Sequence, residues 1–400
     1  MTLRRLQTFT LAGFAIAVSL GEGIALGLLA LLGLMLVLRR DQIRAPGWRA
    51  WVPALGVAGW LGCGAVAWAL GGYGVLDAGE IGRWLSFSAL AIVPLTMNGI
   101  DDETLDRIAF VYVAALAIAT VFALATVAIN VRPGEWLVRG ASAGLHQGRM
   151  PYDASRTVAG GFYFHRLMYA HVVVIGISVL LARQVTVSLP PLRRIFELTV
   201  LVAFFLGLFL TYARAALFAA AAAGAILAIT ARGRSRYALI GVGVVGIGIA
   251  LAIPSVRSRV ASGLAAQAST ERSLIWAQAV RVSADHPLGI GLGNYSRVVS
   301  EYYDTAQASF PTRTYGHNIW LTTWAESGPL GVACFVGGFA LLGWFGFLRR
   351  GDPFGASALA LVTCIFMIGL THDMFFHPPV AMSWAGVLGY LAARLERAEP

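Results

Sequence analysis

Residues 254–318 hold most of the side chains in this chain whose types and spacing could do chemistry. The segment carries six arginines, four acids and two histidines, although apolar runs of membrane-spanning length precede and follow it. It ends at His317-Asn318, directly before another apolar run, so we expect His317 at a membrane surface. A histidine with its ordinary pKa of about 6.5 can accept a proton from a hydroxyl near neutral pH, which is general-base chemistry. The alternative is an interfacial residue that hydrogen-bonds to the backbone.

Two arginines are candidates for holding an anion. The segment 269–280 is expected to begin a helix that Pro287 ends, because a hydroxyl and an acid precede good helix formers. Arg272 would then lie in the first turn, near the positive end of the helix dipole. Arg214 separates two apolar runs, and an arginine at the centre of a bilayer costs about 2.5 to 3.5 kcal/mol unless it faces water or an anion. Pairing of Arg272 with a nearby acid and snorkelling of Arg214 to the interface are the alternatives.

Several residues next to these three are candidates for supporting roles. Tyr212, Tyr315 and Asn318 adjoin Arg214 or His317 in the sequence. Glu326 lies inside an apolar run, where an ionised group is costly unless it is paired, so it either anchors the loop or orients a cation. The Gly-x-Gly-x-Gly spacing of residues 289–293 follows no strand, so we expect close backbone approach to a helix or a ligand, not nucleotide binding.

Composition defines the elements that must position these side chains. Of 400 residues, 58% are hydrophobic and 12% are charged, whereas soluble domains have roughly 25% charged residues. The chain is therefore an integral membrane protein, which excludes the ordinary soluble classes. Its apolar runs lack the alternation of a membrane barrel, so only helices are plausible. We predict an all-α polytopic protein, residues 1–400 forming one transmembrane domain.

The predicted architecture has about twelve transmembrane helices. Their expected ranges are 6–20, 24–38, 51–70, 81–97, 108–129, 167–182, 195–212, 215–231, 237–253, 319–348, 354–371 and 380–394.

Arginine placement gives the orientation. The short connections and both ends of the chain are rich in arginine, which predicts cytoplasmic termini. Residues 130–166 then form a first periplasmic or extracellular loop, and residues 254–318 form a large helical one. Because these loops are also basic, against the usual bias, we expect an anionic partner on that side. All 30 basic residues are arginine; a GC-rich genome and bidentate phosphate binding both explain this preference.

Metal or disulfide chemistry is not expected. Cys63, Cys334 and Cys364 fall inside apolar runs without Cys-x-x-Cys spacing, so they are interpreted as packing residues. The acidic run 101–103 is interpreted as a solvated loop and helix cap. His372 and His377 fall in the last outer loop, where they could line the mouth of a site, but their spacing is not that of a metal site.

Three motifs occur in a fixed order within this many-helix frame. They are Tyr212-Ala213-Arg214, then Glu271-Arg272 with the segment 287–291, then His317-Asn318 with the segment 326–331. Over residues 195–350 the chain resembles the superfamily of O-antigen ligases, O-antigen polymerases and protein O-oligosaccharyltransferases, and most closely the ligases. The resemblance implies a membrane-embedded, GT-C-like glycosyltransferase without a metal or other cofactor. It also implies that Arg214 and Arg272 contact the diphosphate of the donor and that His317 is the essential histidine.

The expected function follows from the resemblance and from these residues. We expect transfer of O-antigen glycan from undecaprenyl diphosphate to lipid A-core oligosaccharide, with inversion and His317 as general base. The expected location is the inner membrane of a Gram-negative bacterium, with the site facing the periplasm, and no nucleic acid is expected as a partner. An O-antigen polymerase or a protein O-oligosaccharyltransferase is the alternative within the superfamily. A lipid-linked glycan flippase is the alternative of another class, although the unusual residues concentrate in one half of the chain.

Overall fold

The computed structural model describes the chain in segments. They are residues 3–19, 22–39, 46–71, 78–130, 149–150, 153–163, 165–231, 266–303 and 316–397, together with 236, 237 and 240.

These residues are mostly helical. In the first half the helices are α1 (Leu3–Ala17), α2 (Glu22–Leu38), α3 (Trp48–Gly71), α4 (Ala78–Ser86), α5 (Ala89–Met97), α6 (Asp102–Ala128), α9 (Arg166–Thr186) and α10 (Pro191–Phe209). In the second half they are α11 (Arg214–Thr230), α14 (Ala266–Asp285), α15 (Tyr295–Val299), α16 (Ile319–Leu348), α17 (Pro353–Gly369) and α18 (Pro378–Arg397), with short 3-10 turns at Ser300–Tyr302 and Met374–Phe376.

The predicted spans fall on these helices. Four helices, α3, α6, α9 and α16, are long and apolar enough to cross a membrane, and α2, α11 and α17 are shorter apolar helices. The expected span 81–97 is divided between α4 and α5, and the expected span 237–253 lies almost wholly outside the described residues. A helical membrane protein is thus confirmed, and the number of crossings stays a prediction.

The strands among the described residues belong to one short antiparallel pair, β1 (Arg149–Met150) and β2 (Asp153–Thr157). It lies within the predicted first outer loop, where no strand is expected from the sequence. Thr157 fixes this pair to the end of α6, since its N–H donates to Asn130 Oδ1 at 2.8 Å and its hydroxyl to the Thr126 carbonyl at 3.1 Å.

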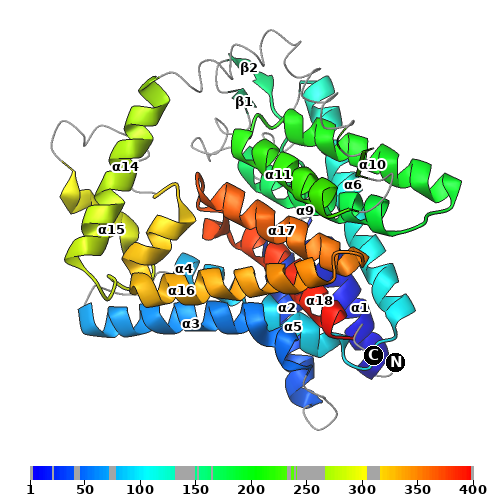
Figure 1. Cartoon of the computed structure of the whole chain (residues 1–400), viewed down its shortest axis with the longest axis horizontal. Coiled ribbons are helices and arrows are strands. Elements are labelled where there is room, and N and C mark those ends of the chain that lie inside the picture. The colour runs from blue at the N-terminus through cyan, green and yellow to red at the C-terminus, as the bar shows by residue number, and fades with distance from the viewer. Residues whose placement is uncertain are drawn as a thin grey trace.

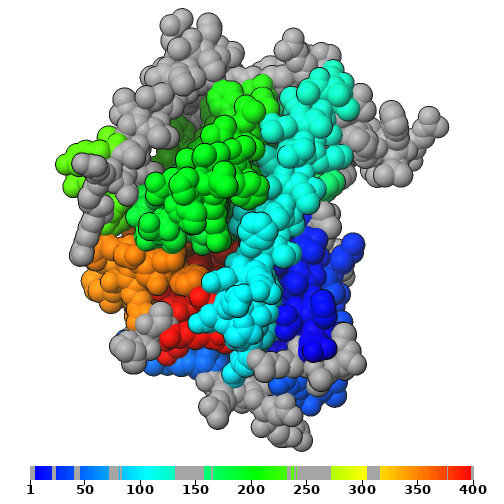
Figure 2. Space-filling model, turned by 90° about the vertical axis from the view of Figure 1, so that its right-hand side faces the viewer, coloured from blue at the N-terminus to red at the C-terminus, as the bar shows by residue number. Residues whose placement is uncertain are grey.

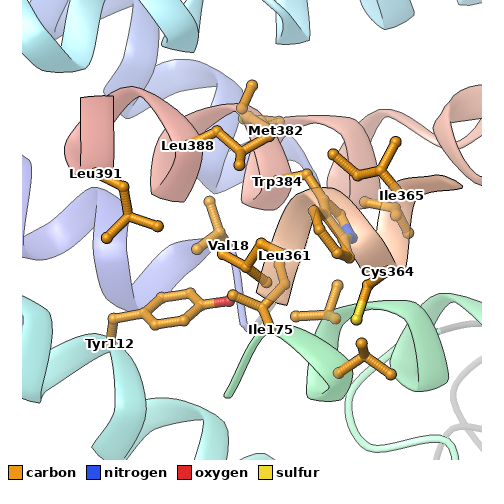
Figure 3. Packing of buried hydrophobic residues seen from close by; sticks show 14 of the residues in the cluster. Val18, Tyr112, Ile175, Leu361, Cys364, Ile365, Met382, Trp384, Leu388 and Leu391 are labelled. Atoms are coloured by element: carbon orange, nitrogen blue, oxygen red, sulfur yellow. The ribbon is translucent and has the colours of Figure 1, made fainter. Parts of the chain in front are cut away.

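The core forms where α6, α9, α17 and α18 meet, as Figure 3 shows around Trp384. Two of its large side chains are bonded through their polar ends: Trp384 Nε1 donates to the His171 carbonyl at 3.1 Å, and the Tyr112 and Ser383 hydroxyls are 3.0 Å apart. Such pairing matters because an unpaired polar group buried from water is costly. This core sets the positions of α9 and α17, which lead to the candidate site.

The two ends of the molecule differ. Helices α14 and α15 lie at the left end in Figure 1, whereas both termini lie together on the right. Ion pairs occur toward the end that holds the termini, where Arg394 Nη1 is 3.2 Å from Asp102 Oδ1 and Arg183 Nη2 is 2.9 Å from Glu197 Oε1. Figure 2 shows a recess on this face between α10 in green and α6 in cyan, where residues of α6, α10 and α18 line a cavity of about 180 Å³.

Candidate functional site

Helix α16 is kinked near its start, and the sequence explains why. Gly328 has φ +67°, and Pro329 has no N–H to donate to the Ala325 carbonyl one turn back. That carbonyl instead accepts from Ile290 N, and the Glu326 carbonyl accepts from Gly291 N, both at 2.9 Å. The glycine-rich segment therefore docks on the kink. This confirms the predicted close backbone approach to a helix.

The approach depends on glycine at position 289. A side chain there would place its Cβ 2.5 Å from the Glu326 carbonyl oxygen, and the residue has φ +93°. Both the contact and the left-handed backbone exclude other residues. The segment that follows α14 is thereby held against α16.

Glu326 fixes the same contact through its side chain. Its Oε1 accepts from Gly293 N at 3.0 Å, and its Oε2 lies 3.7 Å from Arg83 Nη2 on α4. Both side chains are nearly fully buried, at 3% and 6% exposure. Of the two roles that the sequence left open for Glu326, these contacts favour the anchor, and the cation that it faces is Arg83.

His317 lies immediately before α16 in a left-handed conformation, with φ +46°. Its half-buried position is fixed by Asn318, the N-cap of that helix. Asn318 Oδ1 accepts from Trp320 N at 3.0 Å and from Leu321 N at 3.2 Å. Its Nδ2 donates to the Leu370 carbonyl at 3.2 Å, just beyond α17. Asn318 therefore joins the segment that carries His317 to the loop that carries His372.

Arg214 follows a tight turn between α10 and α11. Tyr212, in that turn, has φ +57°, which costs a non-glycine residue about 1 to 3 kcal/mol and is common at functional sites. The Thr211 hydroxyl accepts from Ala213 N at 3.1 Å, and the Thr211 carbonyl accepts from Arg166 Nη1 at 2.7 Å. Arg214 is exposed and is the first residue of α11. The turn thus presents one arginine and is held by another.

Arg272 is half-buried and is the seventh residue of α14, which begins at Ala266. The prediction that Arg272 lies in the first turn is therefore wrong by about one turn. The helix continues toward its N-terminus through residues 266–268, where alanine and glutamine favour helix, so Ser269 is inside the helix and does not cap it. Arg272 consequently lies farther from the positive end of the dipole than expected.

Three predicted residues from separate parts of the chain meet around His372. Burial lowers the pKa of His372, and the positive charges of Arg272, His317, Arg166 and Arg214, in decreasing order, lower it further, to about 3. Arg272 on α14, His317 just before α16, Arg166 on α9 and Arg214 on α11 therefore all lie within electrostatic range of His372.

Two residues of the cluster are not among the expected catalytic or donor-binding residues. Arg166 is expected only as part of the first outer loop, and His372 only as a residue that could line the mouth of a site. A signal for Arg166 existed: it begins the apolar run of α9 as Arg214 begins that of α11. His372 had no such signal, because only the fold brings its loop beside the other three segments.

The starts of α9 and α11 have a charge pattern that favours an anion. Helices α9 and α11 begin with Arg166 and Arg214, and neither has an acid in its first turn. A cation at the positive end of a helix dipole is unfavourable, and a bound anion offsets both charges. Ala213, the N-cap of α11, makes no side-chain cap, so the first backbone N–H groups of that helix receive no hydrogen bond from it.

Other predicted features have simple outcomes. Tyr315 lies outside the described residues. Asp101 caps α6 by accepting from Thr104 N at 2.8 Å, which confirms the interpretation of the acidic run. Cys63, Cys334 and Cys364 are free thiols. In the described part of the chain, no group of three or more His, Cys, Asp or Glu side chains is arranged to hold a metal ion.

Comparison with known families agrees with the motifs. The family model described as O-Antigen ligase matches residues 199–336, about a third of the chain. The matched segment includes Arg214, Arg272, His317 and Glu326. No curated protein matches the chain. The resemblance inferred from the motifs is thus confirmed over this segment.

Proposed function

We propose that this chain, which is of the O-antigen ligase type over residues 199–336, transfers O-antigen glycan from undecaprenyl diphosphate to lipid A-core oligosaccharide. The enzyme is a GT-C-like glycosyltransferase of the inner membrane. Residues 130–166 and 254–318 face the periplasm, and both termini are cytoplasmic. The observation that carries the proposal is the family match over residues 199–336, a segment that includes Arg214, Arg272 and His317, whose charges all act on His372.

The arginines bind the diphosphate of the donor. In this role Arg214 and Arg272 each take one phosphate, because a guanidinium donates two hydrogen bonds to phosphate oxygens and keeps its charge. A lipid diphosphate leaves without a general acid once its growing negative charge is stabilised. The exposed position of Arg214 at the helix start supports this role, since it leaves the guanidinium open to a ligand.

His317 activates the acceptor. Its imidazole removes the proton of an acceptor hydroxyl while that oxygen forms a bond to the anomeric carbon of the donor. The bond from that carbon to the phosphate oxygen breaks on the opposite face, and the diphosphate leaves with the electron pair, so the configuration inverts. General-base catalysis is typically worth about 10²- to 10⁴-fold. The hydrogen bonds of Asn318 support this role, because they fix the backbone next to His317.

The remaining named residues act through these three. Tyr212 shapes the turn that presents Arg214, and Asn318 orients His317. Glu326 holds the glycine-rich segment that follows the helix of Arg272. The histidine and arginine chemistry described here uses no metal ion or cofactor.

The test is a reconstituted transfer. Purified protein receives undecaprenyl-diphosphate-linked glycan and lipid A-core, without nucleotide or added metal, and the products are separated by gel and mass spectrometry. Glycan on lipid A-core is the expected product. Longer lipid-linked glycan would identify a polymerase, glycan on a protein hydroxyl would identify a protein O-oligosaccharyltransferase, and movement of the donor across vesicles without any transfer would identify a flippase. The same assay is applied to the variant Arg214→Ala. Its matched control is Arg193→Ala, which removes an arginine at the end of the molecule that holds the termini.

A further inference from the structure

His372 is held rigidly, with one ring nitrogen left for a ligand. The ring Nδ1 of His372 is 3.1 Å from the Thr371 hydroxyl, and the backbone N–H of His372 donates to the Ile368 carbonyl at 2.9 Å. The ring packs edge-on against that of His171, with centroids 5.5 Å apart. Its Nε2 makes no hydrogen bond to a residue that the structure describes. The half-buried ring therefore keeps Nε2 available to a ligand.

The wall behind His372 is fixed as well. His171 is only 3% exposed, and its carbonyl accepts from Trp384 Nε1 in the core. The neighbouring Leu370 carbonyl accepts from Asn318 Nδ2, which connects the loop to the start of α16. His372 thus has little freedom to turn away from the cluster.

The charges that face His372 come from every element around it. Arg272 belongs to α14, His317 precedes α16, Arg166 begins α9, and Arg214 begins α11. In its own loop, the pKa of His377 is lowered to about 4 by burial, and Asp373 acts on Tyr295. Burial and the surrounding cations together keep His372 neutral at physiological pH.

We propose that His372 Nε2 contacts the diphosphate of the donor beside Arg214 and Arg272, and that it takes up a proton from solvent when this anion binds. The inference rests on the proposed function of the same site. Two phosphate charges offset the cations that oppose protonation, so the imidazolium becomes the favoured form. It then supplies a further charge-assisted hydrogen bond to the group that leaves.

Proton uptake makes donor binding depend on pH. If the pKa of His372 rises on binding from about 3 to its ordinary value of about 6.5, affinity increases about tenfold from about pH 8 to pH 5.5. A polyprenyl-diphospho-sugar suits the measurement because its two phosphodiester charges do not titrate over this range. A second histidine, His317, faces the same ligand, so its titration must be removed.

The experiment measures binding of farnesyl-diphospho-N-acetylglucosamine to the full-length His317→Asn protein by calorimetry, at about pH 8 and pH 5.5. Buffers of different ionisation enthalpy report the protons taken up. The comparison variants add His372→Asn or, as a matched control, His377→Asn, which removes a histidine of the same loop. We expect the roughly tenfold pH effect and the proton uptake to vanish with His372→Asn and to persist with His377→Asn.

The possible results are distinguishable. Binding that requires Arg214 and Arg272 but keeps its pH effect in the His372→Asn protein would overturn the inference and leave the proposed function standing. Failure to bind the probe at either pH, or binding unaffected by Arg214→Ala and Arg272→Ala, would contradict the proposed function itself. Thermal unfolding of each variant in the same detergent verifies that the comparison is made between folded proteins.

Discussion

Replacement of Glu326 by alanine separates a structural anchor from a catalytic carboxylate. The substitution removes the counter-charge 3.7 Å from Arg83 Nη2 and the acceptor of Gly293 N, both in a nearly fully buried region. Removing one partner of a buried ion pair typically costs about 3 to 5 kcal/mol, because the other charge stays buried. We expect a loss of that size in the free energy of unfolding.

Two further variants assign this loss to its causes. Glu326→Gln keeps an acceptor for Gly293 N and removes only the charge, so it should lose less stability than Glu326→Ala. The double variant Arg83→Met with Glu326→Gln should recover part of the loss, since replacing both partners of a buried pair is often neutral. Unfolding in mixed micelles with increasing SDS, followed by tryptophan fluorescence, measures each free energy.

The matched control lies at the other end of the molecule. Glu197→Ala removes a carboxylate of 8% exposure that Arg183 binds at 2.9 Å. We expect it to lose stability without weakening donor binding, whereas Glu326→Ala also weakens binding by releasing the segment that follows α14. A Glu326→Ala protein with wild-type unfolding but no transfer would refute the anchor role and point to direct chemistry.

Three other outcomes follow from the described contacts. Asn318→Ala should cost about 1 kcal/mol of stability through the lost helix cap and should reduce the transfer rate by more than this loss explains. Asn318→Asp keeps the cap but not the bond to the Leu370 carbonyl, so it should unfold nearly as wild type. Wild-type transfer rates in both variants would contradict the orienting role of Asn318. Gly328→Ala should lower the free energy of unfolding by about 1 to 3 kcal/mol, because the residue has φ +67° and the added Cβ would fall 2.9 Å from the Pro287 carbonyl oxygen. Unchanged unfolding in SDS would show that the fold does not require glycine at this kink. The pKa of His377 is about 4 in the folded state, below its ordinary value, so the stability that its neutral form contributes is complete above about pH 6.5 and is lost as the pH falls toward 4. His377→Asn should therefore flatten the dependence of unfolding free energy on pH in this range. An unchanged dependence would contradict a lowered pKa of His377.

The sequence predicted the membrane class and the three central residues for a physical reason. Polar residues are costly within apolar runs, so Arg214 and the segment around His317 stood out against their surroundings. Their order along the chain then matched one family. The helix boundaries near these residues were also close, since the N-cap at Asn318 and the break at Pro287 are local features.

Contacts between residues far apart in the chain could not be predicted from the sequence. Nothing local placed the His372 loop next to the starts of α9 and α11, because that arrangement depends on packing around Trp384 and His171. The docking of the glycine-rich segment on the Ala325 carbonyl could be inferred only in kind, as close approach to an unnamed helix. The start of α14 was misplaced because helix propensity before Ser269 outweighed its capping tendency.

The most direct test of the central claim is the transfer rate of the His317→Ala protein, measured in a single turnover with saturating undecaprenyl-diphosphate-linked glycan and lipid A-core. Binding of the donor is measured in the same preparation, with His377→Asn as the control variant. The account predicts a rate lower by about 10²- to 10⁴-fold with donor affinity largely retained. Transfer at the wild-type rate would contradict it, because the acceptor hydroxyl would then lose its proton without His317.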